Sequence, residues 1–384
     1  MKVNWTYKKF GDVFNLQMGK TPSRDNVSYW GGDNTWVSIA DMKGKYIDST
    51  KEHITDIAVS ESGIHKVPQG TAIMSFKLTI GRAAITKCDL FTNEAIMSFE
   101  PKENGIVLAD YVYYFLNGCK WTGANKAVMG QTLNKKTISE NIFAYPPLAT
   151  QSRIVSELDL LQSIIEKKKE QVKQLDNLAQ AIFYDMFGDP VENEKGWKVK
   201  TLNSVGTVAR GVSKHRPRNA PELLGDYMPF IQTGDIANSG MYITACQSGY
   251  SELGVEQSKI WHKGTLCITI AANIGKCSIM TFDACFPDSV VGFIADSSIT
   301  SVEFVLYYFH CIQQTLEDNA MGVAQKNINL GILNVMKIPV PPLSLQQSFA
   351  QKVESIERQK ELINQSIRES QTLFDSRMEY YFGE

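Results

Sequence analysis

Long apolar runs are missing from this sequence, since nowhere do roughly eighteen apolar residues follow one another, the length that a membrane-spanning helix needs. The first residues, MKVNWTYKKFGD, are basic but lack the apolar stretch of a secretory signal peptide. The seven cysteines form no C-x-x-C pair, and their odd number argues against a disulfide framework or a cysteine zinc site. These absences predict a cytoplasmic protein with reduced thiols.

Motifs for cofactor binding are also absent. No G-x-G-x-x-G segment occurs, and MGKT, which begins at Met18, fails as a phosphate-binding loop because Phe14 stands where that pattern needs glycine. The segment YPPL at Tyr145 lacks the Asp or Asn that precedes the prolines in amino-methyltransferases. The sequence therefore predicts neither a catalytic site nor a bound cofactor.

A strong excess of charge is missing too, because 39 Lys and Arg residues stand against 41 Asp and Glu residues, a formal net charge of -2. The chain thus lacks the global basic surplus of a simple phosphate binder. Nucleic acid is not excluded, since Lys and Arg can gather on one face or share phosphate contacts with a basic partner. The length of 384 residues and the apolar content of 43% predict two or three globular domains.

What the sequence does contain is an internal duplication. VPQGTAIMSFKLTIGRAAI, which begins at Val67, matches WHKGTLCITIAANIGKCSI, which begins at Trp261, at an offset of 194 residues. The same offset aligns Tyr113-Tyr114-Phe115 with Tyr307-Tyr308-Phe309, and an offset of 195 aligns PPLATQ with PPLSLQ. The duplication spans the chain and predicts two copies of one folding unit rather than a solenoid, which needs at least three short repeats.

The duplication weakens the one candidate metal site. Asp89 followed by Glu100-Pro101-Lys102 partly matches the D…E-x-K site of many nucleases, but the second copy has Ile294-Ala295-Asp296 at that place. The five histidines show no ligand spacing. We expect no metal site, with a nuclease use of these carboxylates as the alternative.

The sequence pattern of each copy changes at its PPL segment. Before it, short β-rich runs between Gly, Asn, Asp and Pro predict strand-rich α/β domains at 1–150 and 197–345. After it, apolar residues recur at alternating steps of four and three, the 3.5-residue period of a coiled coil. We therefore predict a long spacer helix and linker at 151–196 and a second long helix at 346–384.

The two helices are expected to meet along a coiled-coil seam. Lys168 interrupts the first half of the seam and Lys360, Ser370 and Arg377 interrupt the second. The two lysines either set the register or extend their amines along the seam to solvent, which is the more ordinary arrangement. The apolar seam positions are Ile154, Leu158, Leu161, Ile165, Val172, Leu175, Ala179, Ile182, Phe349, Val353, Ile356, Ile363, Ile367 and Phe374.

The order of these segments predicts an antiparallel pair. The first helix leads away from the first domain, so the second must run back if its apolar seam is to be buried against the first. One domain then lies at each end, with pseudo-two-fold symmetry. Such an object suits duplex DNA, whose backbone has two-fold axes, and two diverged domains can read two unlike half-sites.

Two α/β units of this kind, each with P-P-L-x-x-Q at the start of a heptad helix that closes with FGD or FGE, resemble the specificity subunits of Type I restriction-modification enzymes. GQT at Gly130 and AQKNIN at Ala324 are similar to the family's Gly/Gln segment, although Ala324 replaces glycine. The resemblance covers essentially the full chain. It implies a non-catalytic subunit whose two target recognition domains read a bipartite double-stranded DNA target.

The resemblance also implies partners. The paired helices would space the domains and dock two modification subunits, which carry S-adenosylmethionine and methylate adenine. A separate restriction/translocase subunit would supply translocation and cleavage. This chain is then expected to have no cofactor of its own.

Candidate DNA contacts are Lys, Arg and Gln residues, because Lys and Arg bind phosphates or guanine and Gln can pair with adenine. Each one taken singly fits a solvated surface role more readily. The alternatives to DNA recognition are a coiled-coil adaptor with two duplicated ligand-binding domains and a small fused enzyme. The candidates are Lys20, Arg24, Lys77, Arg82, Lys126, Gln131 and Lys135 in the first copy and Lys214, Arg216, Arg218, Lys276, Gln325 and Lys326 in the second.

Overall fold

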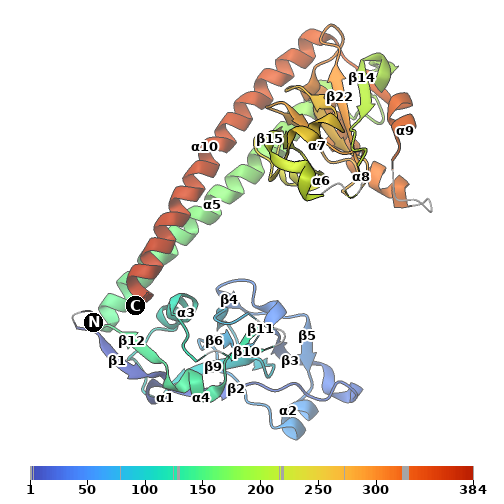
Figure 1. The fold of residues 1–384 in the computed structure, drawn as a ribbon. Helices are drawn as coiled ribbons and strands as arrows, with labels where there is room; N and C mark the ends of the chain where they lie inside the picture. The colour runs from blue at the N-terminus through green and yellow to red at the C-terminus, as the bar shows by residue number, and fades with distance from the viewer. Residues whose placement is uncertain are drawn as a thin grey trace. The chain divides into compact units, whose positions relative to one another are not determined.

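A computed structural model of the chain describes Lys2, Pro217 and residues 4–77, 79–123, 125–127, 130–215, 220–271, 273–321 and 328–383. The chain divides into two compact units, which can be followed by colour in Figure 1: Met1–Lys168 with Ser366–Glu384, and Lys169–Gln365. Each long helix is therefore shared between the units. Among the described residues, no helix has the length and apolar content that crossing a membrane requires.

The first unit is built on a five-stranded sheet with the order β2-β9-β6-β7-β4. Neighbouring strands are antiparallel except β4, which is parallel to β7. A smaller sheet, β5-β3-β8, and the pair β1-β12 complete the strands around it, with the hairpin β10-β11 apart from both. The bounds are β1 Thr6–Lys9, α1 Phe10–Val13, β2 Phe14–Met18, β3 Trp30–Val37, β4 Tyr46–Ile47, β5 Glu52–Ile54, α2 Asp56–Ser62, β6 Ala72–Ser75, β7 Ala83–Thr86, β8 Phe91–Thr92, β9 Ile96–Pro101, α3 Ala109–Gly118, β10 Asn125–Ala127, β11 Gly130–Thr132, α4 Lys135–Glu140 and β12 Ile142–Tyr145.

The second unit repeats this plan. Its five-stranded sheet has the order β14-β22-β19-β20-β16, strand for strand the counterpart of the first, and β13 pairs with β23 as β1 pairs with β12. The duplication expected from the sequence is thus confirmed in the topology. The bounds are β13 Lys198–Thr201, β14 Gly206–Arg210, β15 Leu224–Phe230, α6 Thr233–Asn238, β16 Tyr242–Ile243, β17 Ser248–Tyr250, α7 Glu252–Glu256, β18 Ile260–Trp261, β19 Leu266–Thr269, β20 Cys277–Met280, β21 Ala284–Cys285, β22 Val290–Ala295, α8 Val302–Met321, α9 Leu330–Val335 and β23 Lys337–Val340.

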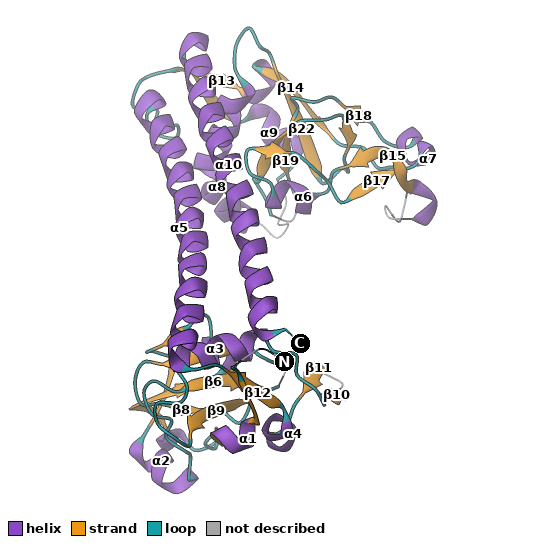
Figure 2. Cartoon of the chain, turned by 90° about the vertical axis from the view of Figure 1, so that its left-hand side faces the viewer, coloured by secondary structure: helices purple, strands orange, loops and turns teal. Residues whose placement is uncertain are grey.

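Aromatic side chains fill the core of the first unit. Helix α3 packs against β6 and β7 there, and Figure 2 shows α3 beside β6. The Phe10 ring lies 5.2 Å from Phe143 and 5.8 Å from Phe115, measured between ring centroids. Phe382, from the far end of the sequence, lies 5.6 Å from Tyr111. The core of the first unit therefore includes residues from both ends of the chain.

The two long helices are α5, Leu148–Phe187, and α10, Leu343–Phe382. Helix α5 begins three residues before the predicted start, because the amides of Thr150 and Gln151 already donate to the Pro147 carbonyl. It ends at Phe187, in the FGD segment where the sequence predicted its close, and Gly188 follows with a φ of 74°, a left-handed conformation that favours glycine.

Contacts within each unit show that the helices run antiparallel. In the first unit, Arg377 Nε lies 2.8 Å from Glu157 Oε1, and Lys168 Nζ lies 2.6 Å from Ser366 Oγ. In the second unit, Lys360 Nζ lies 2.6 Å from Asp176 Oδ1. The partner's number falls on α10 as the residue number rises on α5, which is the antiparallel order expected from the sequence.

Neither seam lysine extends its amine to solvent, so that expectation was wrong. Lys168 Nζ donates to the hydroxyls of Ser366 and Ser370, at 2.6 and 2.9 Å. Lys360, with a side chain only 12% exposed, lies between Asp176 and Glu357. Hydrogen-bond acceptors on the facing helix bind both amines, because a buried amine without a partner would cost more free energy than a paired one.

Candidate nucleic-acid interface

In the first unit, three loops meet at one edge of the five-stranded sheet. Strands β2 and β6 end at this edge and β7 and β9 begin there, because β2 and β6 both run antiparallel to β9. The loops are residues 19–26, 76–82 and 93–95, and within the second of them residue 78 lies outside the described residues. We call this the recognition edge of the first unit.

Backbone hydrogen bonds hold these loops against one another. The amide of Lys20 donates to the Thr92 carbonyl at 2.8 Å, and the amide of Phe76 donates to the Ala95 carbonyl at 3.0 Å. The Leu133 amide donates to the Phe76 carbonyl at 3.0 Å, which brings the segment after hairpin β10-β11 to the same edge. Gly19 permits this approach, since a Cβ there would lie 2.2 Å from the Thr92 carbonyl oxygen.

Lys20 and Arg24 lie on the loop after β2 and already have partners. Lys20 Nζ donates to the Ser62 carbonyl at 2.5 Å. Arg24 makes a bidentate ion pair with Glu52, and its guanidinium lies 3.8 Å from the centre of the Trp30 ring. The hydrogen bond from Arg24 lowers the pKa of Glu52.

Lys77 lies on the 76–82 loop, and its charge acts on Glu94. The hydrogen bond from Thr21 lowers the pKa of Glu94, burial opposes that shift, and the charges of Lys77 and Arg24 lower it further. Lys135 lies exposed at the start of α4, two residues after Leu133. The structure thus brings Lys20, Arg24, Lys77 and Lys135 to the recognition edge.

Other candidates lie elsewhere or are not described. Arg82 ends the 76–82 loop, but it lines a cavity of about 370 Å³ with Lys43 and Asn117, beside α3. Lys126 and Gln131 are register partners in hairpin β10-β11, but their side chains lie outside the described residues.

The second unit has the corresponding recognition edge. The Gly211 amide donates to the Val290 carbonyl at 2.9 Å, and the Ile270 amide donates to the Ser289 carbonyl at 3.1 Å. Like Gly19, Gly211 meets backbone closely, since a Cβ there would lie 2.3 Å from the Pro287 carbonyl oxygen.

The candidates of the second copy are only partly described. Lys214 lies exposed on the loop after β14, and its amide donates to Gln257 Oε1 at 2.7 Å. Lys276 ends the loop between β19 and β20, and it lines a cavity of about 300 Å³ with Lys360 and His310. Arg216, Arg218, Gln325 and Lys326 lie outside the described residues.

The apolar seam residues are all buried or half-buried, but not equally. Ile154, Leu158 and Ile165 in α5 are fully buried, whereas Leu161 and Leu175 are half-buried. Of the four polar seam positions, Lys168 and Ser370 bond to each other across the helices, Lys360 lies between Asp176 and Glu357, and Arg377 lies exposed beside Glu157.

The carboxylates of the nuclease-like pattern are used separately. Glu100 accepts a hydrogen bond from Ser98 and lies 2.7 Å from His65, whereas Asp89 pairs with Lys66. In the described part of the chain, no group of three His, Cys, Asp or Glu residues is placed to hold a metal ion.

Two functional residues that the sequence reasoning missed are the glutamines of the PPLATQ and PPLSLQ motifs. Gln151 is fully buried, accepts from the Leu108 amide at 2.9 Å and donates to the carbonyls of Ile106 and Pro146. Gln346 does the same in the second unit with the Ser301 amide and the Pro341 carbonyl. Their recurrence after both proline pairs was the available signal.

Two stretches of the chain, residues 2–174 and 194–370, match the family model of the Type I restriction modification DNA specificity domain. The chain therefore belongs to this family, and the resemblance drawn from its motifs is confirmed.

Individual relatives agree. The MjaIX specificity subunit of Methanocaldococcus jannaschii is 30% identical over 241 residues, which cover 57% of this chain and 54% of that protein, so the chain spans about half the length of this relative. A putative MjaX specificity subunit of the same organism is 22% identical over 379 residues, covering 92% and 87%. A chain from a structure solved to explain assembly and conformational transition of the type I R-M system has a TM-score of 0.64 at 16% identity, covering 100% and 98%, a likeness of fold.

Proposed function

We propose that each unit of this chain reads one part of a bipartite double-stranded DNA target, so that the chain is the non-catalytic specificity subunit of a Type I restriction-modification system. The observation that carries the proposal is the recognition edge found in both units. Two sheets with one strand order present loops of different sequence at the same edge, which is what reading two unlike half-sites requires. Membership of the DNA specificity family supports DNA as the ligand.

The recognition edge of the first unit supplies cations for phosphate contacts. Lys20 and Lys77 lie on adjacent loops and Lys135 lies at the start of α4. Their flexible amines can neutralise backbone phosphates. Arg24 is the weaker candidate, because DNA would have to displace Glu52 from a bidentate pair.

The long helices are proposed to space the two domains and to dock two modification subunits. Exposed apolar side chains on their outer surfaces support this. Leu178 is 48% exposed and Leu373, its counterpart 195 residues later, is 47% exposed. Exposed leucines at matching places in both copies fit two copies of one partner. That partner would carry S-adenosylmethionine, and a restriction subunit would join the complex.

Binding to duplex DNA at several salt concentrations tests the proposal. The chain, co-expressed with its modification subunit, is expected to lose affinity steeply as salt rises, because bound phosphates release counterions. Mapping methylated adenines across the host genome should then show a target in two parts with a fixed gap. An adaptor that does not bind DNA would show neither the salt slope nor the methylation.

A further inference from the structure

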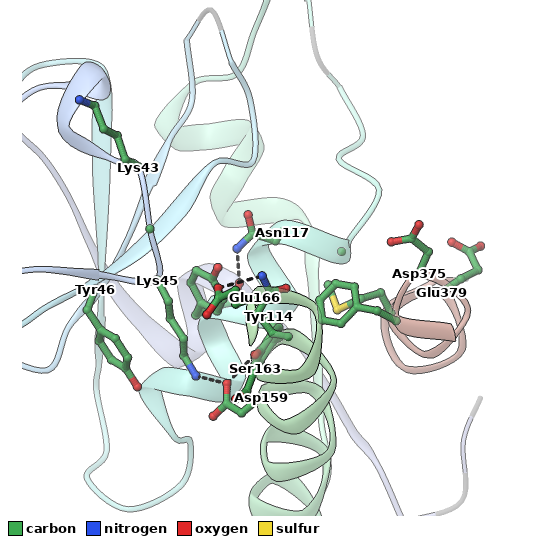
Figure 3. Close-up of a pocket in the computed structure, with 16 residues that line it drawn as sticks. Lys43, Lys45, Tyr46, Tyr114, Asn117, Asp159, Ser163, Glu166, Asp375 and Glu379 are labelled. Atoms are coloured by element: carbon green, nitrogen blue, oxygen red, sulfur yellow. Dashed lines mark hydrogen bonds and ion pairs between the residues drawn. The ribbon is translucent and has the colours of Figure 1, made fainter. Parts of the chain in front are cut away.

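The largest cavity that we describe in the first unit contains a nearly buried lysine. The cavity, about 790 Å³, lies between residues 43–46, α3 and the parts of α5 and α10 that belong to this unit (Figure 3). The Lys45 side chain is only 16% exposed, and it points toward α5, where Figure 3 marks its contact with Asp159.

Lys45 joins two different helices. Its Nζ atom lies 2.7 Å from Asp110 Oδ1 in α3 and 2.6 Å from Asp159 Oδ1 in α5. Two tyrosines complete the cluster: Tyr46 donates to Asp110 at 2.7 Å and Tyr114 donates to Asp159 at 2.5 Å.

Lys45 and Asp110 keep their charges in this cluster. Burial lowers the pKa of Lys45, but the hydrogen bonds and charges of Asp110 and Asp159 outweigh it, so the pKa of Lys45 is raised. Burial raises the pKa of Asp110, but Lys45 and Tyr46 outweigh it, so that pKa is lowered. The amine and the Asp110 carboxylate are therefore both ionised at neutral pH.

Lys45 is also fixed to the sheet. Its carbonyl accepts a hydrogen bond from the Ile85 amide of β7 at 2.8 Å. Strand β7 begins at the recognition edge, immediately after the 76–82 loop. Lys45 thus connects the sheet that presents the recognition loops directly to the spacer helix.

The second copy lacks this connection. Met241 occupies the place of Lys45, since its carbonyl accepts from the Ile279 amide at 2.9 Å, and Ile279 is the counterpart of Ile85. At the repeat offsets, Phe304 replaces Asp110 and Glu354 replaces Asp159. Met241 and Phe304 are buried in the apolar core of the second unit. The ionic tie is therefore a property of the first copy alone.

Directional bonds at two points along a rod fix its direction better than bonds at one. Gln151 bonds the first turn of α5 to residues 106–108, and Asp159 bonds α5 to Lys45 eight residues later, about 12 Å along the helix. The apolar contacts of Ile154 and Leu158 lie between these points and are non-directional.

We infer that Lys45 is a positioning residue, which fixes the first recognition domain on the spacer helix and so sets how strictly the gap between the two half-sites is enforced. The inference rests on the proposed function. With the tie removed, small rotations of the domain on α5 would move its recognition edge along the duplex and admit gaps of the wrong length.

The test compares Lys45→Met, which introduces the residue of the second copy, with wild type and with Lys43→Met. Among the described residues Lys43 has no ion-pair partner, so it is a matched loss of charge in the same segment. The full chain is co-expressed with its modification subunit, and affinity is measured for duplexes that carry the methylated target with its native gap or a gap changed by one base pair.

For Lys45→Met, the preference for the native gap over the altered gaps is expected to fall about two- to fivefold, the range that one or two partly exposed ion pairs supply. Affinity for the native gap should stay close to wild type, and Lys43→Met and Lys45→Arg should keep the preference. Asp159→Asn should reproduce the loss, which decides the matter if Lys45→Met folds poorly.

An unchanged preference in both Lys45→Met and Asp159→Asn would overturn the inference. An equal loss of affinity for every gap would also overturn it, because Lys45 would then serve folding or phosphate contact. If the wild type binds none of the duplexes, the proposed function fails, and the inference fails with it. The wild-type measurement therefore distinguishes a failure of the proposed function from a failure of the inference alone.

Discussion

Gln151 and Gln346 are the residues on which the start of each long helix depends. Both are fully buried, and each joins the first turn of its helix to a loop more than forty residues earlier in the chain. A buried amide in such a place is costly to replace, because the groups that it bonded stay away from water without a partner. The proline pair and the glutamine thus act together at each junction.

Gln346→Leu is expected to lower the stability of the second unit. It leaves the Ser301 amide and the Pro341 carbonyl without their bonds, at a cost of about 1–3 kcal/mol. Gln347→Leu is the control, since that neighbouring side chain is exposed. The midpoint of urea unfolding measures both, and equal midpoints for the two variants would contradict the role given to Gln346.

Gly19→Ala is expected to displace the recognition loop of the first unit. The added Cβ would collide with the Thr92 carbonyl oxygen, which is backbone and cannot turn aside. Affinity for the target should fall while the fold survives. Gly44→Ala has open space for its Cβ and should bind like wild type. Should Gly19→Ala bind normally as well, the loops at this edge do not contact DNA.

For single residues, the sequence indicates which ones matter better than it indicates which partners they bind. The motif around Gln151 was visible, but its bonds reach residues 106–108, which no spacing along the chain indicates. Arg24 was a reasonable candidate by type, yet its pair with Glu52 depends on how β5 lies beside β3.

Two faces of the same long helix serve different purposes. Leu175 packs against the core of the second unit, while Leu178, less than one turn later, faces outward. The heptad spacing predicted which residues point inward. It could not show that polar bridges replace apolar contacts in the middle of the seam, because these depend on the facing residues of the other helix.

Leu175→Asp and Leu178→Asp separate these purposes. A carboxylate at position 175 would enter a half-buried apolar contact and should lower the stability of the second unit by about 2–4 kcal/mol. At position 178 stability should hold, but binding of the modification subunit should weaken. Thermal unfolding and co-purification report the two effects. Wild-type stability of Leu175→Asp would refute the seam assignment.

The bridge at Lys360 predicts a dependence on pH. Burial lowers its pKa, but the bonds to Asp176 and Glu357 raise it above the ordinary value overall. A raised pKa in the folded state contributes stability that is complete below the unfolded value and is lost as pH rises through the folded one. The advantage of wild type over Lys360→Met in unfolding free energy should therefore shrink above about pH 10.4. An advantage that is constant across this range would contradict the charged bridge.

For the whole molecule, the two copies of one topology predict separable recognition. Replacing residues 197–345 with the corresponding segment of a relative should change one half of the methylated target and leave the other half intact. Methylation mapping of the hybrid reads both halves at once. A change in both, or in neither, is incompatible with one half-site per unit.

The duplication itself was fully readable from the sequence, because matching segments such as those at Val67 and Trp261 became equivalent strands of equivalent sheets. The division of the chain into compact units could not be read from the sequence. The prediction separated helices from domains, whereas the contacts assign half of each helix to each unit, since the apolar seam continues into both cores.

The first unit contains residues 366–384 as well as 1–168, and this has a consequence for synthesis. A ribosome completes all of Lys169–Gln365 before it makes Tyr381 and Phe382, a delay of roughly 10–40 seconds at ordinary rates of translation. During that interval the second unit has its whole sequence, while the rings of Tyr111 and Phe115 lack the aromatic neighbour that will cover them. The unit that leaves the ribosome first is therefore the last to be finished.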